Sequence, residues 1–127
     1  MTPDAVAVRD SLYAANPHLD TSTVQYFTDS ESLNFELLAA PFSVLTAVHF
    51  YNFSMQHPVY ALQYNETKAC LLGAFRCNDP LTDIGLPLQL SVERAILEVA
   101  TRQARGDSSA TVTIDVGVAE FPHPSMI

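Results

Sequence analysis

Residues 42–55 read FSVLTAVHFYNFSM, and this stretch decides the expected fold. Valine, phenylalanine, tyrosine and threonine favour β-strands, and large apolar side chains occupy both alternating sets of positions. One set holds Phe42, Val44, Val48 and Phe50, and the other holds Leu45, Ala47, Tyr51 and Phe53. Because successive side chains of a strand point to opposite faces, a strand of this composition needs cover on both faces.

Further strands are expected before and after this stretch. Residues 23–40 favour strands through the alternation of Leu33, Phe35 and Leu37, although a short helix over residues 31–40 also fits.

Three later segments are also expected to form strands. The runs 59–64 and 69–75 flank the turn-prone residues 65–68, which predicts a β-hairpin. Residues 111–118 alternate polar and apolar side chains, which predicts a final strand.

Helices are expected near the two ends of the chain. Thr2 followed by Pro3 is typical of a helix start, and this helix should end near Asn16. Residues 88–105 carry an apolar stripe at helical spacing and stop before Gly106, a residue that favours helix ends. The element order predicts an α+β fold in which an antiparallel or mixed sheet of about five strands packs against two helices. The 127 residues fit a single domain.

The charge balance restricts the classes of partner. Six Lys and Arg residues stand against 14 Asp and Glu, for a net charge of −8. Such a chain repels a phosphate backbone and an anionic bilayer surface, so we expect neither nucleic acid nor membrane as a partner. The N-terminal residues show no secretory signal, which favours a cytoplasmic location.

Motifs for catalysis or cofactor binding are absent from the sequence. His18, His49, His57 and His123 are scattered and lack the spacing of a metal site. The four glycines cannot form a phosphate-binding or dinucleotide-binding loop. We therefore expect no metal, no cofactor and no enzymatic activity.

Two short patterns receive a structural interpretation. Cys70 and Cys77 are expected to be reduced and unpaired, because two cysteines are too few for a disulfide framework. Asn52-Phe53-Ser54 and Asn65-Glu66-Thr67 match the glycosylation sequon. Without a secretory signal we expect neither asparagine to be used.

Residues Asp79 to Ala104 resemble a segment of small virion proteins of tailed phages that build necks, tails or adaptors. The resemblance is carried by a turn rich in Asp and Pro, by Leu86-Pro87-Leu88, and by an amphipathic helix that contains Ile96 and Ala100. It covers about a fifth of the chain and implies self-assembly into rings, with a location in the virion. It assigns no functional residues.

The sequence favours a non-enzymatic structural or assembly protein that forms homo-oligomers and also binds other assembly proteins. Apolar residues 42–55 and a basic stripe on the second helix supply the expected interface: Phe42, Val44, Val48, Phe50, Tyr51, Phe53, Arg94, Arg102 and Arg105. Alternatively, Glu98 pairs with Arg94 or Arg102 on a solvated helix face.

Two other functions fit the same sequence. One is a small-molecule-binding or hydrolytic α+β domain, whose apolar pocket is lined by Tyr26, Phe50, Tyr51 and Tyr60 with His49 or His57 as the polar group. The other is an acidic inhibitor or regulator that mimics a polyanion.

Overall fold

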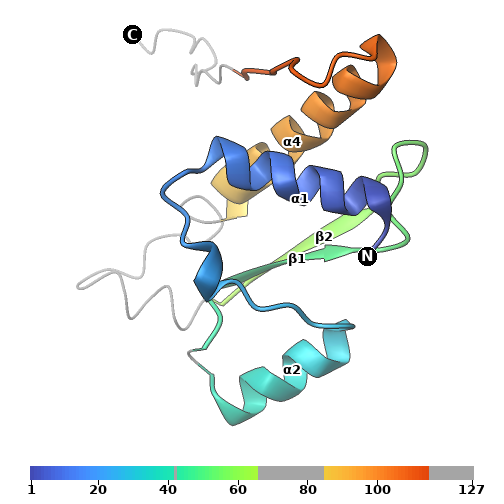
Figure 1. Ribbon diagram of the computed structural model, residues 1–127. Helices are drawn as coiled ribbons and strands as arrows, with labels where there is room; N and C mark the ends of the chain where they lie inside the picture. The colour runs from blue at the N-terminus through green and yellow to red at the C-terminus, as the bar shows by residue number, and fades with distance from the viewer. Residues whose placement is uncertain (42, 66–84, 115–127) are drawn as a thin grey trace, which may run out of the picture.

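A two-stranded antiparallel hairpin lies between helices in this protein. The structure is a computed structural model and describes residues 1–41, 43–65 and 85–114. In chain order it contains α1 (Pro3–Ala15), the 3₁₀ helix η1 (Thr21–Thr23), α2 (Ser30–Ala39), β1 (Thr46–Phe50), β2 (Tyr60–Tyr64) and α4 (Leu86–Arg105). Helices α1 and α4 lie over one face of the hairpin, and α2 lies beyond the other face (Figure 1).

The expected sheet of about five strands against two helices is wrong. The fold is α+β, but the described residues form three α-helices and only two strands. Strand β2 was expected, yet its partner is β1, whereas the expected partner at residues 69–75 lies outside the described residues. Residues 111–114 form no strand in the described part of the chain, and residues 115–118 lie outside it.

Helix α2 replaces the strand expected over Leu33 to Leu37. The carboxylate of Asp29 caps the helix by accepting a hydrogen bond from the Ser32 N–H at 2.7 Å. Leu33 is buried while Phe35 is 75% exposed, which breaks the alternation that suggested a strand. The spacing of Leu33 and Leu37 instead places both side chains on one face of a helix, where they line the cavity between α2 and the hairpin.

The hairpin register divides its side chains between the two helical layers. Phe50 pairs with Tyr60, and both pack against the core on the side of α1 and α4. Ala47 pairs with Gln63, and both line the cavity on the side of α2. Each face of the hairpin therefore meets a helix of the same chain.

The main core joins α1, α4 and the loop between the strands. Its buried residues are Ala5, Val8, Phe53, Ala95 and Val99. Phe53 lies in the loop, is 1% exposed, and meets Phe50 edge to face at 5.1 Å between ring centroids.

The N-terminus of α1 also holds the loop through hydrogen bonds. Thr2 Oγ1 donates to the Phe53 carbonyl at 2.6 Å, and Asp4 accepts from the Met55 N–H at 2.9 Å. A buried aromatic ring and two polar contacts thus fix the loop against α1.

The two helices expected from the sequence are present. Thr2 caps α1 by accepting from the Ala5 N–H at 3.2 Å, and Asn16 follows its last residue. Helix α4 ends at Gly106, whose φ of 63° is left-handed and favours glycine. Val92 and Val99 of α4 are buried, as the apolar stripe indicated.

Candidate functional site

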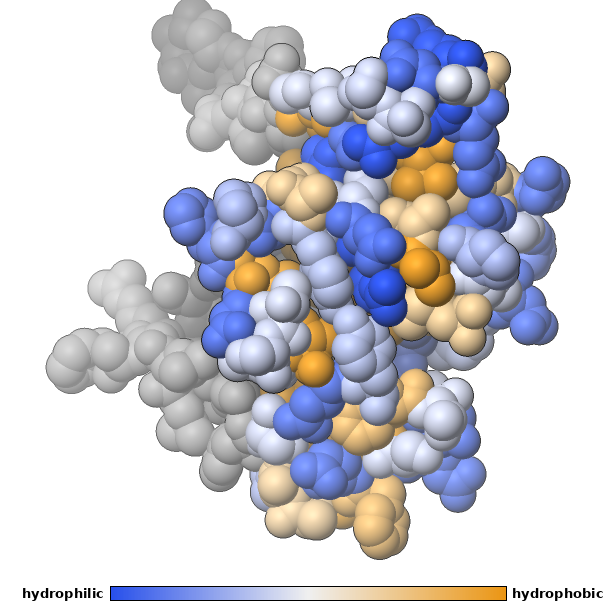
Figure 2. Space-filling model, in the orientation of Figure 1, coloured by the Kyte–Doolittle hydropathy of each residue, from blue (hydrophilic) through white to orange (hydrophobic). Residues whose placement is uncertain are grey.

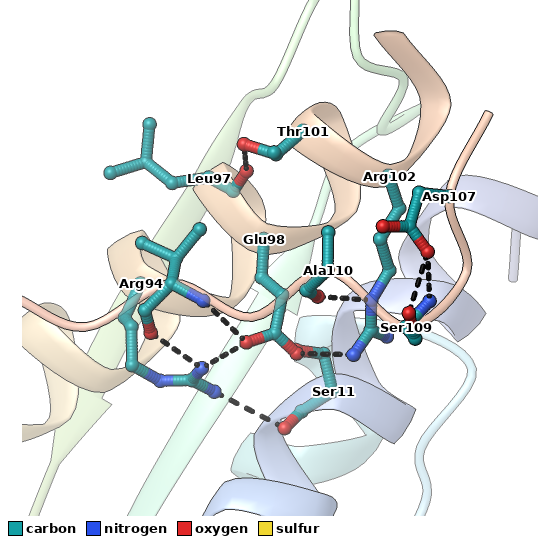
Figure 3. Close-up of polar contacts among 10 residues, drawn as sticks. Ser11, Arg94, Leu97, Glu98, Thr101, Arg102, Asp107, Ser109 and Ala110 are labelled. Atoms are coloured by element: carbon teal, nitrogen blue, oxygen red, sulfur yellow. Dashed lines mark hydrogen bonds and ion pairs between the residues drawn. The ribbon is translucent and has the colours of Figure 1, made fainter. Parts of the chain in front are cut away.

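A polar network of side-chain and backbone groups surrounds Glu98 in the middle of α4. Its carboxylate is 6% exposed and receives donors from three parts of the chain (Figure 3). Oε1 accepts from the Ser11 hydroxyl at 2.9 Å and pairs with Arg102 at 2.8 Å. Oε2 accepts from Arg94 at 2.8 Å and from the Val112 N–H at 3.2 Å. We call these residues the Glu98 cluster.

The arginines of this cluster also bind backbone carbonyls. Arg94 donates to the Ser11 carbonyl in α1 at 3.2 Å, and Arg102 donates to the Ala110 carbonyl at 2.8 Å (Figure 3). The cluster therefore connects α1, α4 and the segment that follows α4.

The electrostatics of the cluster keep Glu98 ionised. Burial opposes ionisation, but donors from Val112 and Ser11, together with the positive charges of Arg94 and Arg102, hold the Glu98 pKa below its usual value. Both carboxylate oxygens already have two partners, which leaves no free position for a proton or ligand. This arrangement stabilises the fold and is poorly suited to acid–base catalysis.

The structure separates the three arginines of the expected basic stripe. Arg94 and Arg102 pair with the same buried carboxylate at i, i+4 spacing, as the alternative interpretation proposed. However, Glu98 is buried and does not lie on a solvated face. Arg105 is exposed near the end of α4. The single carboxylate of Glu98 thus offsets one of the three positive charges of the stripe and holds two of its arginines within the chain.

The expected interface residues between 42 and 55 also lie in different places. Phe53 is in the core and Phe50 packs against it, while Tyr51 is 48% exposed. Val44 lines the cavity beside α2, and Val48 is half-buried in β1. Phe42 lies outside the described residues. From the sequence, one face of the hairpin was expected to lack cover within the chain. Helix α2 covers that face, so an uncovered apolar face no longer supports an oligomer interface. The interface itself stays a prediction.

The cavity between α2 and the hairpin has a volume of about 300 Å³. Its lining includes Leu33, Leu37, Val44, Leu45 and Gln63. The aromatic residues expected to line a pocket, Tyr26, Phe50, Tyr51 and Tyr60, are not among the residues around this cavity.

His49 lies between Ser30 of α2 and Gln63 of β2. Its Nδ1 is 3.3 Å from Ser30 Oγ, and its Nε2 is 3.0 Å from Gln63 Oε1. A serine next to a histidine can serve as a nucleophile and base, but neither Ser30 nor His49 lines the cavity where a substrate would sit. The contacts instead fasten α2 to the hairpin, and His57 is exposed in the loop between the strands.

Tyr60 makes a polar contact that sequence reasoning missed. Its hydroxyl donates a hydrogen bond to Glu93 and so joins β2 to α4. Burial, the hydrogen bond and the negative charge of Glu93 together raise the Tyr60 pKa well above its usual value. The sequence carries no signal for this pair, because the two residues lie 33 positions apart.

Large apolar side chains remain at the surface of two helices. Phe35 and Leu38 of α2 are 75% and 84% exposed. Leu86, Leu90 and Leu97 of α4 are also exposed, on the side opposite the buried valines. Apolar groups reach the surface over α2 at the lower end of the molecule in Figure 2. These side chains are part of the exposed apolar surface of the described residues and are available for binding.

The described residues contain neither a metal-binding cluster nor a membrane-spanning helix. No group of three His, Cys, Asp or Glu side chains within residues 1–41, 43–65 and 85–114 could hold a metal ion. In the same part of the chain, every helix is too short or too polar to cross a bilayer. Cys70 and Cys77 lie outside these residues, so their expected state is not tested.

Comparison with known proteins relates this chain to a transporter. It is 34% identical over 103 residues to the ABC transporter A family member 2 of Arabidopsis thaliana. The aligned region covers 81% of this chain but 10% of the transporter, so the chain spans about a tenth of its relative. No protein-family model matches the chain, and no solved structure matches it.

The resemblance to tailed-phage virion proteins is wrong. The similarity found is to a plant ABC transporter and extends over most of the chain. An Asp- and Pro-rich turn before an amphipathic helix is common to many α+β domains, so this pattern does not identify a family.

Proposed function

We propose that this chain is a non-enzymatic interaction module that corresponds to an extramembrane segment of an ABC transporter. The observation that carries the proposal is the 34% identity over 103 residues to the Arabidopsis protein. An alignment of this length spans α-helices and strands alike and cannot arise from one shared helix.

Two features support a segment that lies outside the membrane and does not include the nucleotide-binding P-loop of a transporter. The described residues contain no helix suited to crossing a bilayer. The sequence has only four glycines, at positions that cannot form a P-loop. The cytoplasmic location expected above rested on the first residues of the chain. A segment of a transporter takes its side of the membrane from the spans around it.

The outer face of α2 supports a binding role. Phe35 and Leu38 lie one helical turn apart and are mostly exposed, whereas Leu33 of the same helix is buried toward the hairpin. A helix with apolar side chains on two faces is suited to packing between two partners. We assign its outer face to another segment of the same transporter polypeptide.

A segment exchange tests this proposal. In the Arabidopsis transporter, the matching segment is replaced by this chain, and the amount of monodisperse transporter in the membrane fraction is measured. The exchanged transporter should accumulate to a level similar to the natural one. As a control, Val8→Asp disrupts the core and should abolish accumulation.

The isolated chain provides the comparison that makes a failure informative. If circular dichroism and thermal melting show that the chain folds, but the exchanged transporter aggregates, the proposal is contradicted. Homo-oligomerisation is the other use of the same surface. Light scattering that gives a multiple of the 13.9 kDa chain mass would favour a second copy as the partner.

A further inference from the structure

We propose that the outer face of α4 is a dimerisation surface, on which α4 of a second copy of the chain packs antiparallel. Six positions of this face follow one another at alternating spacings of four and three residues, as the a and d positions of a coiled coil do. They are Leu86, Leu90, Glu93, Leu97, Ala100 and Ala104, and we call them the α4 seam. The inference goes beyond the proposed function and concerns a different helix from α2.

The leucines of the α4 seam are about half exposed. Leu86 and Leu97 are each 49% exposed, and Leu90 is 38% exposed. Val92 and Val99, on the opposite side of the same helix, are buried. Within the described residues, α4 therefore has two apolar faces, one packed inside the chain and one accessible to solvent. Leucines at coiled-coil spacing favour another helix as the cover of the accessible face.

The charged side chains of α4 leave the seam open to a partner. The Glu98 cluster binds two arginines of α4, and Leu97 is directed away from that cluster (Figure 3). Glu93 is the charged member of the seam, and its carboxylate accepts a hydrogen bond from the Tyr60 hydroxyl of β2. A second helix can thus approach the seam without leaving the Glu93 carboxylate unpaired.

An antiparallel pair of α4 helices makes the seam complementary to itself. In one register, Leu86 lies opposite Ala104 of the second copy. The same register places Leu90 opposite Ala100, so that large side chains meet small ones and the helices interdigitate. A parallel pair would place the two copies of Glu93 together, which is a contact of like charges. The antiparallel pair has two-fold symmetry and closes as a dimer.

The size of the seam limits the affinity of the dimer. Helix α4 has 20 residues and is about 30 Å long. One pair of helices of this length is at the small end of the interfaces found in stable complexes. We therefore expect a dimer that forms at high concentration and dissociates on dilution.

Sedimentation equilibrium and light scattering of the isolated chain test for the dimer. The mass should rise from 13.9 kDa toward twice that value as the protein concentration increases. Leu90→Ser/Leu97→Ser should remain at the monomer mass, with the circular dichroism spectrum of the wild type. A wild type that stays monomeric up to about 1 mM overturns the inference, and so does a dimer that withstands Leu90→Ser/Leu97→Ser.

The outer face of α2 supplies the matched control. Phe35→Ser/Leu38→Ser alters two exposed apolar side chains of α2 and should leave the dimer intact. A dimer that this variant dissociates would place the second copy on α2 and overturn the α4 seam. A dimer through α4 leaves the outer face of α2 free for another segment of the transporter, so the segment exchange still decides the proposed function whatever the mass of the isolated chain.

Disulfide cross-linking tests the antiparallel orientation, in chains that also carry Cys70→Ser and Cys77→Ser. Under mild oxidation, a mixture of the Leu90→Cys and Ala100→Cys chains should give a cross-linked dimer, because the register brings these positions face to face. Leu90→Cys alone should give none, since its two copies would lie about 15 Å apart along the helices, beyond the reach of a disulfide. Cross-linking of Leu90→Cys to itself, or no cross-link in the mixture, overturns the antiparallel seam.

Discussion

Glu98 shows how one buried carboxylate can join distant parts of this chain. It receives Ser11 from α1, two arginines from α4 and the Val112 N–H from the following segment. Removing one partner from such a cluster leaves the other charges without compensation. Removal of the Glu98 carboxylate would leave Arg94 and Arg102 without their negatively charged partner.

We expect Glu98→Gln to destabilise the protein by about 1–3 kcal/mol, because the substitution leaves Arg94 and Arg102 unpaired. The side chain of Arg102 is 32% exposed, so water can partly replace its lost partner. This solvation moves the expected loss of stability toward the lower end of the range. Urea unfolding at neutral pH measures the change. Asp10→Asn is the matched control, since it breaks an exposed ion pair with Arg9 and should leave the midpoint unchanged. Equal midpoints for Glu98→Gln and wild type would contradict this role.

The same carboxylate predicts how stability changes with pH. The Glu98 pKa is lowered in the folded state, so its contribution is present above the unfolded value of about 4.3 and is lost as pH falls through the folded value. The difference in unfolding free energy between wild type and Glu98→Gln should be full at neutral pH and shrink in acid. Urea titrations at a series of pH values measure this. A difference that stays constant down to about pH 3 would show that the charge of Glu98 does not stabilise the fold.

At the scale of elements, α2 depends on its N-terminal cap. Asp29 accepts the Ser32 N–H, which would otherwise have no partner within the helix. Asp29→Ala should lower helicity and the melting temperature, whereas Asp29→Asn should retain both because asparagine is also a good cap. Circular dichroism with thermal melting compares the three proteins. Identical melts for Asp29→Ala and Asp29→Asn would contradict the capping role.

The hairpin predicts different outcomes for two adjacent aromatic residues. Phe50 packs against the core, so Phe50→Glu should destabilise the chain by about 3 kcal/mol or more. Tyr51 is 48% exposed, so Tyr51→Glu should leave the chain folded. Chemical unfolding of both variants measures the difference. Equal destabilisation would show that both faces of β1 are equally buried.

The elements that the sequence predicted are those with strong local signals. Thr2 and Pro3 mark the start of α1, and Gly106 marks the end of α4. The pattern from Leu33 to Leu37 fits two structures. Its apolar residues alternate as in a strand, and Leu33 and Leu37 also have the i, i+4 spacing of a helix. The structure has the helix, in which Asp29 caps the N-terminus, Leu33 is buried and Phe35 is exposed.

The candidate site was less predictable because its contacts are long-range. Spacing within α4 revealed that Glu98 can pair with Arg94 or Arg102. It could not reveal Ser11, which lies 87 positions away, or the burial of the whole cluster. For the same reason, the hairpin face opposite α1 was assigned to an oligomer partner, whereas it lies against α2 in the same chain (Figure 1).

At the scale of the whole molecule, the chain combines a core of its own with an apolar outer face on α2. The core joins α1, α4 and the loop that contains Phe53. Phe35 and Leu38 lie outside that core and contribute exposed surface. A change at these two residues should therefore affect association and leave the stability of the isolated chain almost unchanged.

The most direct measurement compares Phe35→Ser/Leu38→Ser with wild type in the transporter that carries this chain in place of its own segment. The isolated double variant should melt at the same temperature as wild type, while the amount of monodisperse transporter in the membrane fraction should fall several-fold. Asn34→Ser, an exposed polar change on the same helix, should alter neither quantity. Unchanged accumulation of the double variant would contradict the proposal that α2 binds another segment of the transporter.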